Sequence, residues 1–460
     1  MAKKRAFKTP LKVGEVNLPE GFKDEMKNLL GEEAESLFKA LEEEPVVSIR
    51  LNRRKPTEGP IFAKMEPVEW CKSGYYLSER PDFGHNPLLY AGTFYVQESS
   101  SMIYEQIMEK LVGEFQKTSG ERRPLKVLDL CAAPGGKSTA ILNALADEDL
   151  LVSNEYDRKR AWILKENIEK WGSGNVVVTN NAASDIGRLQ EKFDIIAVDA
   201  PCSGEGMMRR EPVARSQWSE GLVEQCSNLQ REIVDDILPA LKEGGFLIYS
   251  TCTFNRKENE ENINRFIEEY GLEPVSLKLK GVEGVLRGLG TKAGALRFMP
   301  HKTKGEGLFV AVLRKTGSGE GHKTSTNKGR IVEDRWEEIR SGDSVYEIKS
   351  AGKEMVKALE SKGKDIRILS AGKPKSELKG KLEIPLSASV LCRGKEMEFP
   401  VVELTEEEAL RYLRRENLRF SEDTPRGYLA VSYKGQPLGL IKNLGNRANN
   451  LYPTEWKIRN

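Results

Sequence analysis

Short apolar segments alternate with longer amphipathic segments between residues 125 and 315, and no other feature of the sequence restricts the fold as strongly. Strands and helices that alternate at this spacing favour a parallel sheet wound in both directions from its centre. The predicted strands are nearly continuous apolar runs, which is expected when helices cover both faces of a sheet. We therefore predict an α/β domain over residues 121–314, with strands LKVLDL, LLVSNE, NVVVT, FDIIAVDA and GFLIYST, and with ALRFMP and GLFVAVLRK closing one edge.

The segments on either side of this domain have other patterns. At about 150 residues per domain, 460 residues suggest about three domains. Residues 1–120 combine helical spacing over 15–45 with a strand pattern in PVVSIRLN, which predicts an N-terminal α+β lobe. The stretch KTGSGEGHKTSTNKGR, residues 315–330, contains four glycines and predicts a flexible linker. An intermediate domain over 331–390 and a final domain over 391–460 are expected to follow.

Composition removes several classes of protein. Lys and Arg number 72 against 70 Asp and Glu, so any basic surface must be local. Six cysteines without a CxxC pair and three scattered histidines argue against a disulfide scaffold and against a metal site. The start MAKKRAFKTP leads into no apolar segment, and no run of about 18 apolar residues follows. We expect a cytoplasmic monomer without a membrane span.

The segment LDLCAAPGGK, Leu128–Lys137, joins a predicted strand to a predicted helix. Glycines allow the backbone to approach a ligand closely, and the N-terminus of a helix offers free N–H groups. A P-loop is excluded because Cys131 stands where its first glycine must be, and the dinucleotide pattern GxGxxG is absent. The remaining interpretations are a tight turn or the S-adenosylmethionine loop of a methyltransferase, with Glu155 after the next strand binding ribose hydroxyls.

Two further segments place a cysteine just beyond a buried strand. They are FDIIAVDAPCSGEG, which contains Cys202, and YSTCTFNRKE, which contains Cys252. In a doubly wound sheet the carboxyl ends of the strands line the ligand crevice. Both cysteines and Asp199 are therefore predicted to meet at the cofactor.

These motifs resemble those of the Nop/Sun family of RNA cytosine-5 methyltransferases. LDLCAAPGGK, DAPCSGEG and STCT carry the resemblance in this order, and YVQESSSM before the sheet also matches. The tail GQPLGLIKNLGNRANNLYP resembles the RNA-binding tail domain of the bacterial RsmF group, which modifies small-subunit ribosomal RNA. The resemblance implies a class I (Rossmann-like) methyltransferase sheet, a PUA-like RNA-binding domain over 391–460, S-adenosylmethionine as cofactor and 16S ribosomal RNA as substrate. It also implies that the N-terminal lobe supports RNA binding.

The resemblance also implies the roles of individual residues. Carbon 5 of cytosine becomes nucleophilic only after a thiolate adds to carbon 6, and the family motif gives this role to Cys252. Cys202 serves the release step, Asp199 holds the cytosine edge, and Lys137 has a positioning or electrostatic role. The cofactor site is expected to contain Cys131, Ala132, Ala133, Pro134, Gly135, Gly136, Lys137, Glu155, Asn181 and Asp199.

One position departs from the family pattern. After the third strand the family usually has an acid that reaches the adenine amino group, whereas this chain has Ala182 there. Asn181 could supply a carbonyl acceptor, or Asp185 could turn towards the cofactor. Both alternatives stay open at this point.

Basic residues gather in three places. Thr424–Asn460 contains six Lys and Arg and one acid, and within it Lys442 and Arg447 are candidate RNA contacts. Arg209 and Arg210, after the DAPC motif, are expected at the rim of the base pocket. Residues 362–381 contain seven Lys and Arg and two acids, which indicates either a second RNA-facing strip or an exposed loop.

Three other functions compete with this one. DNA cytosine-5 methylation is disfavoured because in those enzymes the cysteine of the PC motif attacks, and a second cysteine like Cys252 is not expected. A non-catalytic RNA-binding ribosome assembly factor would not need Cys202, Cys252 and Asp199 together. A tRNA cytosine-5 methyltransferase would have the same catalytic residues, so it differs only in substrate.

Overall fold

The computed structural model describes residues 16–57, 59–119, 123–291, 294–316, 335–363, 366–392 and 398–459. The predicted linker over 315–330 lies outside these residues beyond Thr316, so that prediction stays untested. Within the described ranges, no helix is long and apolar enough to cross a bilayer.

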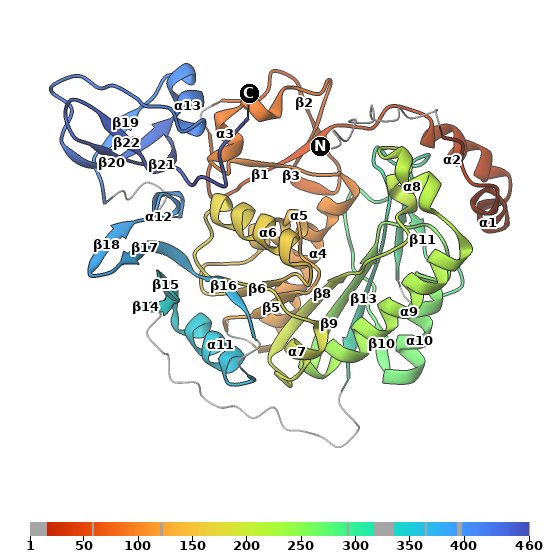
Figure 1. Cartoon of the computed structure of the whole chain (residues 1–460). Helices are drawn as coiled ribbons and strands as arrows, with labels where there is room; N and C mark the ends of the chain where they lie inside the picture. Colours follow the sequence, from red (N-terminus) through yellow and green to blue (C-terminus); the bar gives the residue numbers. More distant parts are fainter. Residues whose placement is uncertain are drawn as a thin grey trace, which may run out of the picture.

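The predicted α/β fold class is confirmed. A central sheet runs in the order β11-β12-β13-β9-β8-β5-β6-β7-β16 (Figure 1). Its five parallel strands are β5 (Lys126–Asp129), β6 (Leu150–Asn154), β7 (Val176–Thr179), β8 (Phe193–Asp199) and β9 (Leu241–Thr251). One edge is extended by antiparallel strands, as predicted: β11 (Leu286–Arg287), β12 (Leu296–Phe298) and β13 (Leu308–Lys315), with β10 (Leu272–Pro274) paired to β13.

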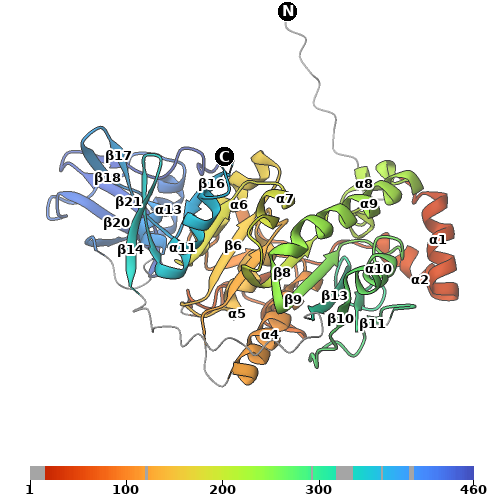
Figure 2. The same cartoon turned by 90° about the horizontal axis from the view of Figure 1, so that it is seen from below.

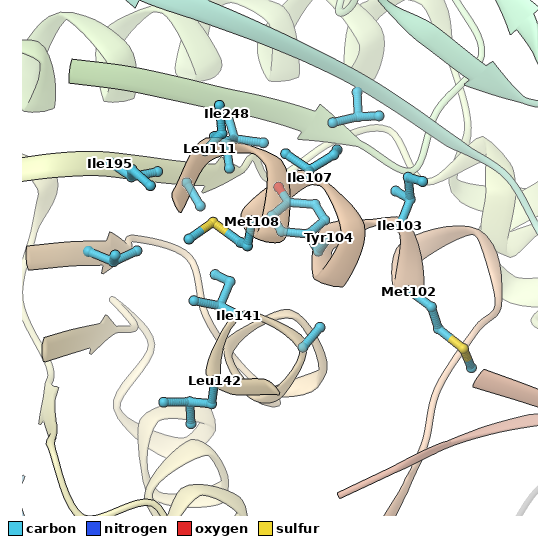
Figure 3. Packing of buried hydrophobic residues seen from close by; sticks show 14 of the residues in the cluster. Met102, Ile103, Tyr104, Ile107, Met108, Leu111, Ile141, Leu142, Ile195 and Ile248 are labelled. Carbon is cyan, nitrogen blue, oxygen red and sulfur yellow. The ribbon is translucent and has the colours of Figure 1, made fainter. Parts of the chain in front are cut away.

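Helices cover both faces of this sheet because its strands are apolar on both sides. Val127 packs into one hydrophobic cluster and its neighbour Leu128 into the other. The first cluster includes α4 (Ile103–Ser119), α5 (Gly136–Ala144) and α6 (Arg158–Trp171). Figure 3 shows Tyr104, Ile107 and Met108 of α4 lying between α5 and the strands that carry Ile195 and Ile248. The other cluster includes α7 (Ala183–Gly187), α9 (Glu220–Ile237) and α10 (Glu260–Tyr270).

The N-terminal lobe contains a four-stranded sheet in the order β2-β3-β1-β4. Its elements are β1 (Ser48–Leu51), β2 (Met65–Val68), β3 (Cys71–Leu77), α3 (Pro87–Tyr90) and β4 (Phe94–Val96). The predicted helical stretch at 15–45 is divided into α1 (Glu20–Leu30) and α2 (Ala34–Leu41) at Gly31, whose φ is 60°. These two helices pack beside α8 (Pro212–Gln217), against Trp218 and Phe254.

The C-terminal part lies at the opposite end of the molecule from α1 and α2 (Figure 2). One sheet, in the order β14-β15-β17-β18, contains β14 (Trp336–Ser341), β15 (Ser344–Lys349), β17 (Lys373–Lys379) and β18 (Leu382–Pro385), accompanied by α11 (Ser350–Glu360). Between them β16 (Ile368–Ala371) leaves this sheet and pairs antiparallel with β7, which the sequence analysis did not predict. The segment over 331–390 therefore contributes a strand to the methyltransferase sheet.

The last segment forms a second small sheet, in the order β19-β20-β21-β22. It consists of β19 (Val401–Glu403), β20 (Gly427–Tyr433), β21 (Gln436–Asn443) and β22 (Ala448–Asn450), with α13 (Glu406–Leu413), and α12 (Ala388–Leu391) packs against β21. Tyr412 and Trp456 share one hydrophobic cluster with Ile49 and Phe94 of the N-terminal lobe. Lys170 of α6 lies between the rings of Tyr90 and Trp456, 4.9 and 5.1 Å from their centres. The two flanking regions are thus packed together (Figure 1).

Candidate active site

The order of the parallel strands locates the ligand crevice. The chain passes outward from β5 through β6 to β7, and then returns to β8 on the other side of β5. In such sheets ligands bind outside the carboxyl ends of the strands, at the point where the order reverses. The loops after β5, β6, β8 and β9 meet there, and these loops carry the motifs that the sequence analysis selected.

The loop after β5 is held by both neighbouring strands. The Leu130 N–H donates to the carbonyl of Ala197 at 2.9 Å, and the Ala132 N–H donates to that of Asn154 at 2.8 Å. Gly135 has a φ of 116°, a conformation that favours glycine, and helix α5 begins directly after it. Cys131 is half-buried, and the surrounding burial raises the pKa of its thiol, so this cysteine is suited to packing rather than to nucleophilic attack.

Glu155 lies at the carboxyl end of β6 and contacts the same loop. One carboxylate oxygen accepts a hydrogen bond from the Ala133 N–H at 3.3 Å, and the other accepts one from the Asp157 N–H at 2.9 Å. Arg160 approaches the carboxylate at 3.7 Å and donates to the Ala133 carbonyl at 2.6 Å. The acid therefore borders the glycine loop, where its predicted ribose contact would require it.

Asp129, the last residue of β5, is a site residue that the sequence analysis missed. Its Oδ2 accepts a hydrogen bond from Ser138 Oγ at 2.6 Å, whereas Oδ1 is buried with no hydrogen-bond partner among the described residues. Burial raises the pKa of this carboxyl to about 7, and the negative charge of Asp199 acts in the same direction. Its position at the end of a strand, beside the glycine loop, could have identified it, because the same argument selected Asp199.

Asp199 and Lys137 form an ion pair across the crevice. Lys137 Nζ lies 2.7 Å from Oδ2 of Asp199, and Oδ1 accepts a hydrogen bond from Ser250 Oγ at 2.7 Å. Ser250 also hydrogen-bonds Tyr104 at 2.9 Å. Burial disfavours the charge on Lys137, but the attraction of Asp199 outweighs it and raises the pKa of the lysine. Both oxygens of Asp199 are therefore held in place.

The two cysteines lie beside each other. The Sγ atoms of Cys202 and Cys252 are 3.2 Å apart and share a hydrogen bond. Parallel pairing of β8 with β9 explains this proximity, because Asp199 is in register with Ser250 and each cysteine follows two or three residues later. The hydrogen bond with Cys252 and burial raise the pKa of the Cys202 thiol, so this sulfur keeps its proton.

Two buried glutamates join the loops that carry the cysteines. Glu205 accepts hydrogen bonds from the N–H groups of Phe254 and Asn255 at 2.6 and 2.9 Å. Glu258 accepts from the Ser203 N–H at 3.0 Å and from Asn255 Nδ2 at 2.7 Å. Each acid belongs to one loop and binds the other, so together they fix the separation of the two sulfur atoms. The burial of these two glutamates could not be predicted, because other charged residues stand near them in the sequence.

Gly206 allows the two cysteine loops to approach closely. Its N–H donates to the carbonyl of Cys252 at 2.8 Å, and a Cβ at this position would lie 2.7 Å from the same oxygen. Any larger residue would force the loops apart. Arg50 of the N-terminal lobe, also missed from the sequence, supports the cofactor side, because it donates to the carbonyls of Thr139 and Gly136 at 3.1 and 3.2 Å.

Two predicted site residues make contacts that the sequence did not indicate. Asn181, proposed as an adenine acceptor, is buried, and its amide is engaged by the backbone of Arg367: Oδ1 accepts from the N–H at 2.9 Å and Nδ2 donates to the carbonyl at 3.2 Å. The strand β16, inserted beside β7, brings Arg367 there. Asp185, the other candidate, closes the first turn of α7 by accepting from the Ala182 N–H at 3.3 Å.

Arg209 is likewise buried, whereas the prediction placed it at the pocket rim. Its guanidinium donates to the carbonyls of Glu43, Glu44 and Gly305, at 3.3, 2.8 and 3.3 Å. Its partners on the N-terminal lobe lie more than 160 residues earlier, so local sequence could not reveal them. Arg210 is exposed, and so is Arg447, while Lys442 is half-buried with its ammonium 5.0 Å from the centre of the Tyr428 ring.

Among the described residues, no group of three or more His, Cys, Asp and Glu side chains is arranged to hold a metal ion.

Three family models match the chain. The model for the 16S rRNA methyltransferase RsmB/F matches residues 119–314, and that for the N-terminal domain of 16S rRNA methyltransferase RsmF matches residues 18–99. The model for the methyltransferase RsmF PUA domain matches residues 399–458. The PUA model thus covers the small sheet β19–β22.

Solved structures support the same fold. A methyltransferase homolog from Pyrococcus horikoshii superposes with a TM-score of 0.54 at 26% identity, covering 65% of this chain and 95% of that chain. NSun6 from the same organism gives a TM-score of 0.55 at 22% identity, covering 65% of this chain and 99% of that chain, which shows likeness of fold alone.

Similarity to sequenced relatives extends over nearly the whole chain. The ribosomal RNA small subunit methyltransferase F of Cronobacter sakazakii is 31% identical over 477 residues, covering 96% of this chain and 97% of that protein. The corresponding protein of Shewanella loihica is 30% identical over 438 residues, covering 89% and 88%. The chain therefore belongs to the ribosomal RNA small subunit methyltransferase F family.

Proposed function

We propose that this protein methylates carbon 5 of cytosine in 16S ribosomal RNA, with S-adenosylmethionine as methyl donor and a covalent Cys252–cytosine intermediate. The observation that carries the proposal is the pair of sulfur atoms 3.2 Å apart at the ends of adjacent parallel strands. Many methyl transfers need only one nucleophile. Addition of a sulfur to carbon 6, followed by release of the methylated base, gives two sulfur atoms separate roles. The family membership supports ribosomal RNA as the substrate class.

The residues at the crevice fit S-adenosylmethionine. The glycine loop leads into α5, Glu155 borders the loop, and Oδ1 of Asp129 is buried without a partner among the described residues. Such a polar atom needs a ligand or a proton to balance its burial. When bound, S-adenosylmethionine supplies an electrophilic methyl group at its sulfonium centre.

Cys252 is the sulfur suited to attack. The Cys202 thiol keeps its proton and lies within hydrogen-bond distance of Cys252, so it can donate to a thiolate at Cys252. The Cys252 thiolate forms a bond to carbon 6 of the ring, and the displaced electron pair makes carbon 5 nucleophilic. After carbon 5 is methylated, its proton passes to water, the electron pair of that C–H bond restores the double bond between carbons 5 and 6, and the bond from carbon 6 to sulfur breaks to return the Cys252 thiolate. Cys202, which lies against Cys252, assists this release.

Asp199 orients the base for this addition. Its carboxylate is fixed by Lys137 and Ser250, and it stands at the end of the strand that leads to Cys202. A fixed carboxylate can accept a hydrogen bond from the cytosine amino group, and in its protonated form it can donate one to a ring nitrogen. Either contact keeps carbon 6 facing the sulfur. Lys137 positions Asp199 and adds a positive charge to the crevice.

Bisulfite sequencing tests the proposal in cells. The 16S ribosomal RNA from cells that contain this protein should show at least one cytosine that is protected from conversion, and deletion of the protein should remove that protection. A copy encoding Cys252→Ala should not restore it, whereas the wild-type copy should. Identical patterns in the presence and absence of the protein would reject 16S ribosomal RNA as substrate. Loss of protection in tRNA instead would assign the activity to tRNA.

A further inference from the structure

A cavity of about 500 Å³ lies beside the cofactor crevice, outside the residues assigned so far. It is open to solvent and is bordered by α6, by the segment leading into β16, and by the ends of β14 and α11. The lining combines aromatic, cationic and apolar side chains, chiefly Trp162, Arg158, Arg367, Ile368 and Leu369, with Glu360 as the acid.

The aromatic and cationic side chains in this lining are exposed, and Lys165 Nζ, which also pairs with Glu169, lies 5.6 Å from the centre of the Trp162 ring. The side chain of Trp162 is 49% exposed, although indole rings usually contribute to cores or interfaces. Arg158 and Arg367 are both exposed as well. Trp162 and Arg158 lie one helical turn apart on α6, so they face the same side of the helix. The cavity is thus lined by one large ring and by two arginines.

Arg367 is held in place by the methyltransferase domain. Asn181 binds both the N–H and the carbonyl of Arg367, and the Asn180 N–H donates to the same carbonyl at 3.0 Å. Pairing of Ile368 with Thr179 continues this attachment into β16. The backbone at Arg367 is therefore anchored to the end of β7, whereas the Arg367 side chain is exposed to solvent. This anchoring uses Asn181, the side chain expected from the sequence to bind adenine.

The cavity and the cofactor crevice share Asn180. This residue lines the cavity, and its Nδ2 donates to the carbonyls of Glu155 and Tyr156, at 2.8 Å each. Glu155 borders the glycine loop. A molecule in the cavity therefore lies near the end of β6, on the side away from β8. Glu155, the residue predicted to bind the ribose hydroxyls, stands at this strand end.

We propose that this cavity binds one nucleotide of single-stranded RNA, with its base against the indole of Trp162 and a phosphate next to Arg158 and Arg367. The inference rests on the proposed function, because it names a contact of that RNA outside the reacting cytosine. Aromatic rings stack on any unpaired base, and guanidinium groups bind phosphate through paired hydrogen bonds. The contact gives Arg367, which belongs to the basic stretch at 362–381, a task in positioning the substrate.

Binding of a single-stranded oligoadenylate of about 12 nucleotides to the full chain tests this contact. Trp162→Ala should weaken binding by about 5- to 100-fold, while Trp162→Phe, which keeps a ring, should lose less. Arg367→Ala should lower the slope of log affinity against log salt by about 0.7. Arg265→Ala is the matched control, since this arginine pairs with Glu269 on α10 at the other side of the sheet. S-adenosylmethionine binding should be unchanged in all four variants, which also shows that they are folded.

Methylation kinetics separate the failure of this inference from that of the proposed function. With ribosomal RNA as substrate, Trp162→Ala should raise KM and leave kcat close to the wild-type value. If the wild type methylates cytosine and Trp162→Ala has unchanged RNA affinity and KM, the cavity does not bind RNA and the proposed function stands. If Trp162→Ala and Arg367→Ala bind the oligoadenylate normally but bind small ribosomal subunits weakly, the occupant of the cavity is a protein and the inference is wrong. A wild type that methylates no cytosine contradicts the proposed function itself, whatever the oligoadenylate does.

Discussion

The catalytic crevice and the C-terminal half of the molecule are built in different ways. In the crevice, Asp199, Cys202 and Cys252 follow two strands that pair directly, so a few residues of motif fix their relative positions. In the C-terminal half, the position of Arg367 depends on pairing of β16 with β7, nearly 190 residues earlier in the chain. Local motifs therefore specify the crevice where adjacent strands end together, whereas the surface proposed to bind RNA at Arg367 depends on long-range packing. This contrast leads to opposite expectations for variants in the two regions.

The largest expected effect lies in the crevice. Asp199→Ala should lower kcat by about 100-fold or more, because it removes the group that orients the base and leaves Lys137 without its partner. Ser250→Ala removes one hydrogen bond to the same carboxylate and serves as the graded comparison. Single-turnover methylation at saturating RNA measures both. Wild-type kcat in Asp199→Ala would show that the crevice is not fixed by this ion pair.

Asp129 should make folding stability depend on pH. Its pKa is about 7 in the folded protein, against 3.8 for an ordinary aspartate. The folded state therefore holds the proton more tightly, and the contribution is fully present below about pH 4 and is lost as the pH rises to about 7. Asp129→Asn cannot ionise, so relative to the wild type its free energy of unfolding should gain up to about 4 kcal/mol across this range. Urea unfolding without cofactor measures it, and a constant difference between the two proteins would contradict the burial of a charged group here.

Glu155→Ala should weaken S-adenosylmethionine binding by about 1–3 kcal/mol, because the ribose hydroxyls and the Ala133 N–H lose their acceptor. RNA affinity should change little, which would separate the cofactor side of the crevice from the RNA-binding surfaces. Glu155→Gln keeps one acceptor and should lose less. Calorimetry decides, and unchanged cofactor affinity in Glu155→Ala would remove this residue from the site.

The smallest effect is expected in the C-terminal domain. Lys442 and Arg447 lie on the hairpin formed by β21 and β22, away from the crevice. Replacing both by alanine should weaken RNA binding a few-fold and lower the salt slope by about 1.4, if each cation contacts one phosphate of an unpaired strand. The half-buried Arg411, which pairs with Glu416 on the same domain, is the control. An unchanged salt slope in the double variant would show that this surface does not contact RNA and that other regions recognise it.

Sequence alone predicted the sheet, its antiparallel edge and the meeting of Cys202 with Cys252, because apolar runs and strand ends are local signals. It could not predict Glu205 and Glu258 as the acids that join the two cysteine loops, since a glutamate in a charged loop normally faces solvent. The contacts that Asn181 and Arg209 make could not be predicted either, for one shared reason. Each side chain is occupied by backbone groups that lie more than 160 residues away in the sequence.

The central claim is that Cys252 attacks cytosine and Cys202 releases it, and trapping of the protein–RNA adduct tests this most directly. Purified Cys252→Ala, Cys202→Ala and wild-type protein are incubated with S-adenosylmethionine and ribosomal RNA, and covalent complexes are separated in SDS. Cys202→Ala should accumulate an SDS-resistant adduct with little turnover, because addition proceeds while release fails. Cys252→Ala should form no adduct and no 5-methylcytosine. An adduct in Cys252→Ala and none in Cys202→Ala would reverse the two roles and contradict the account.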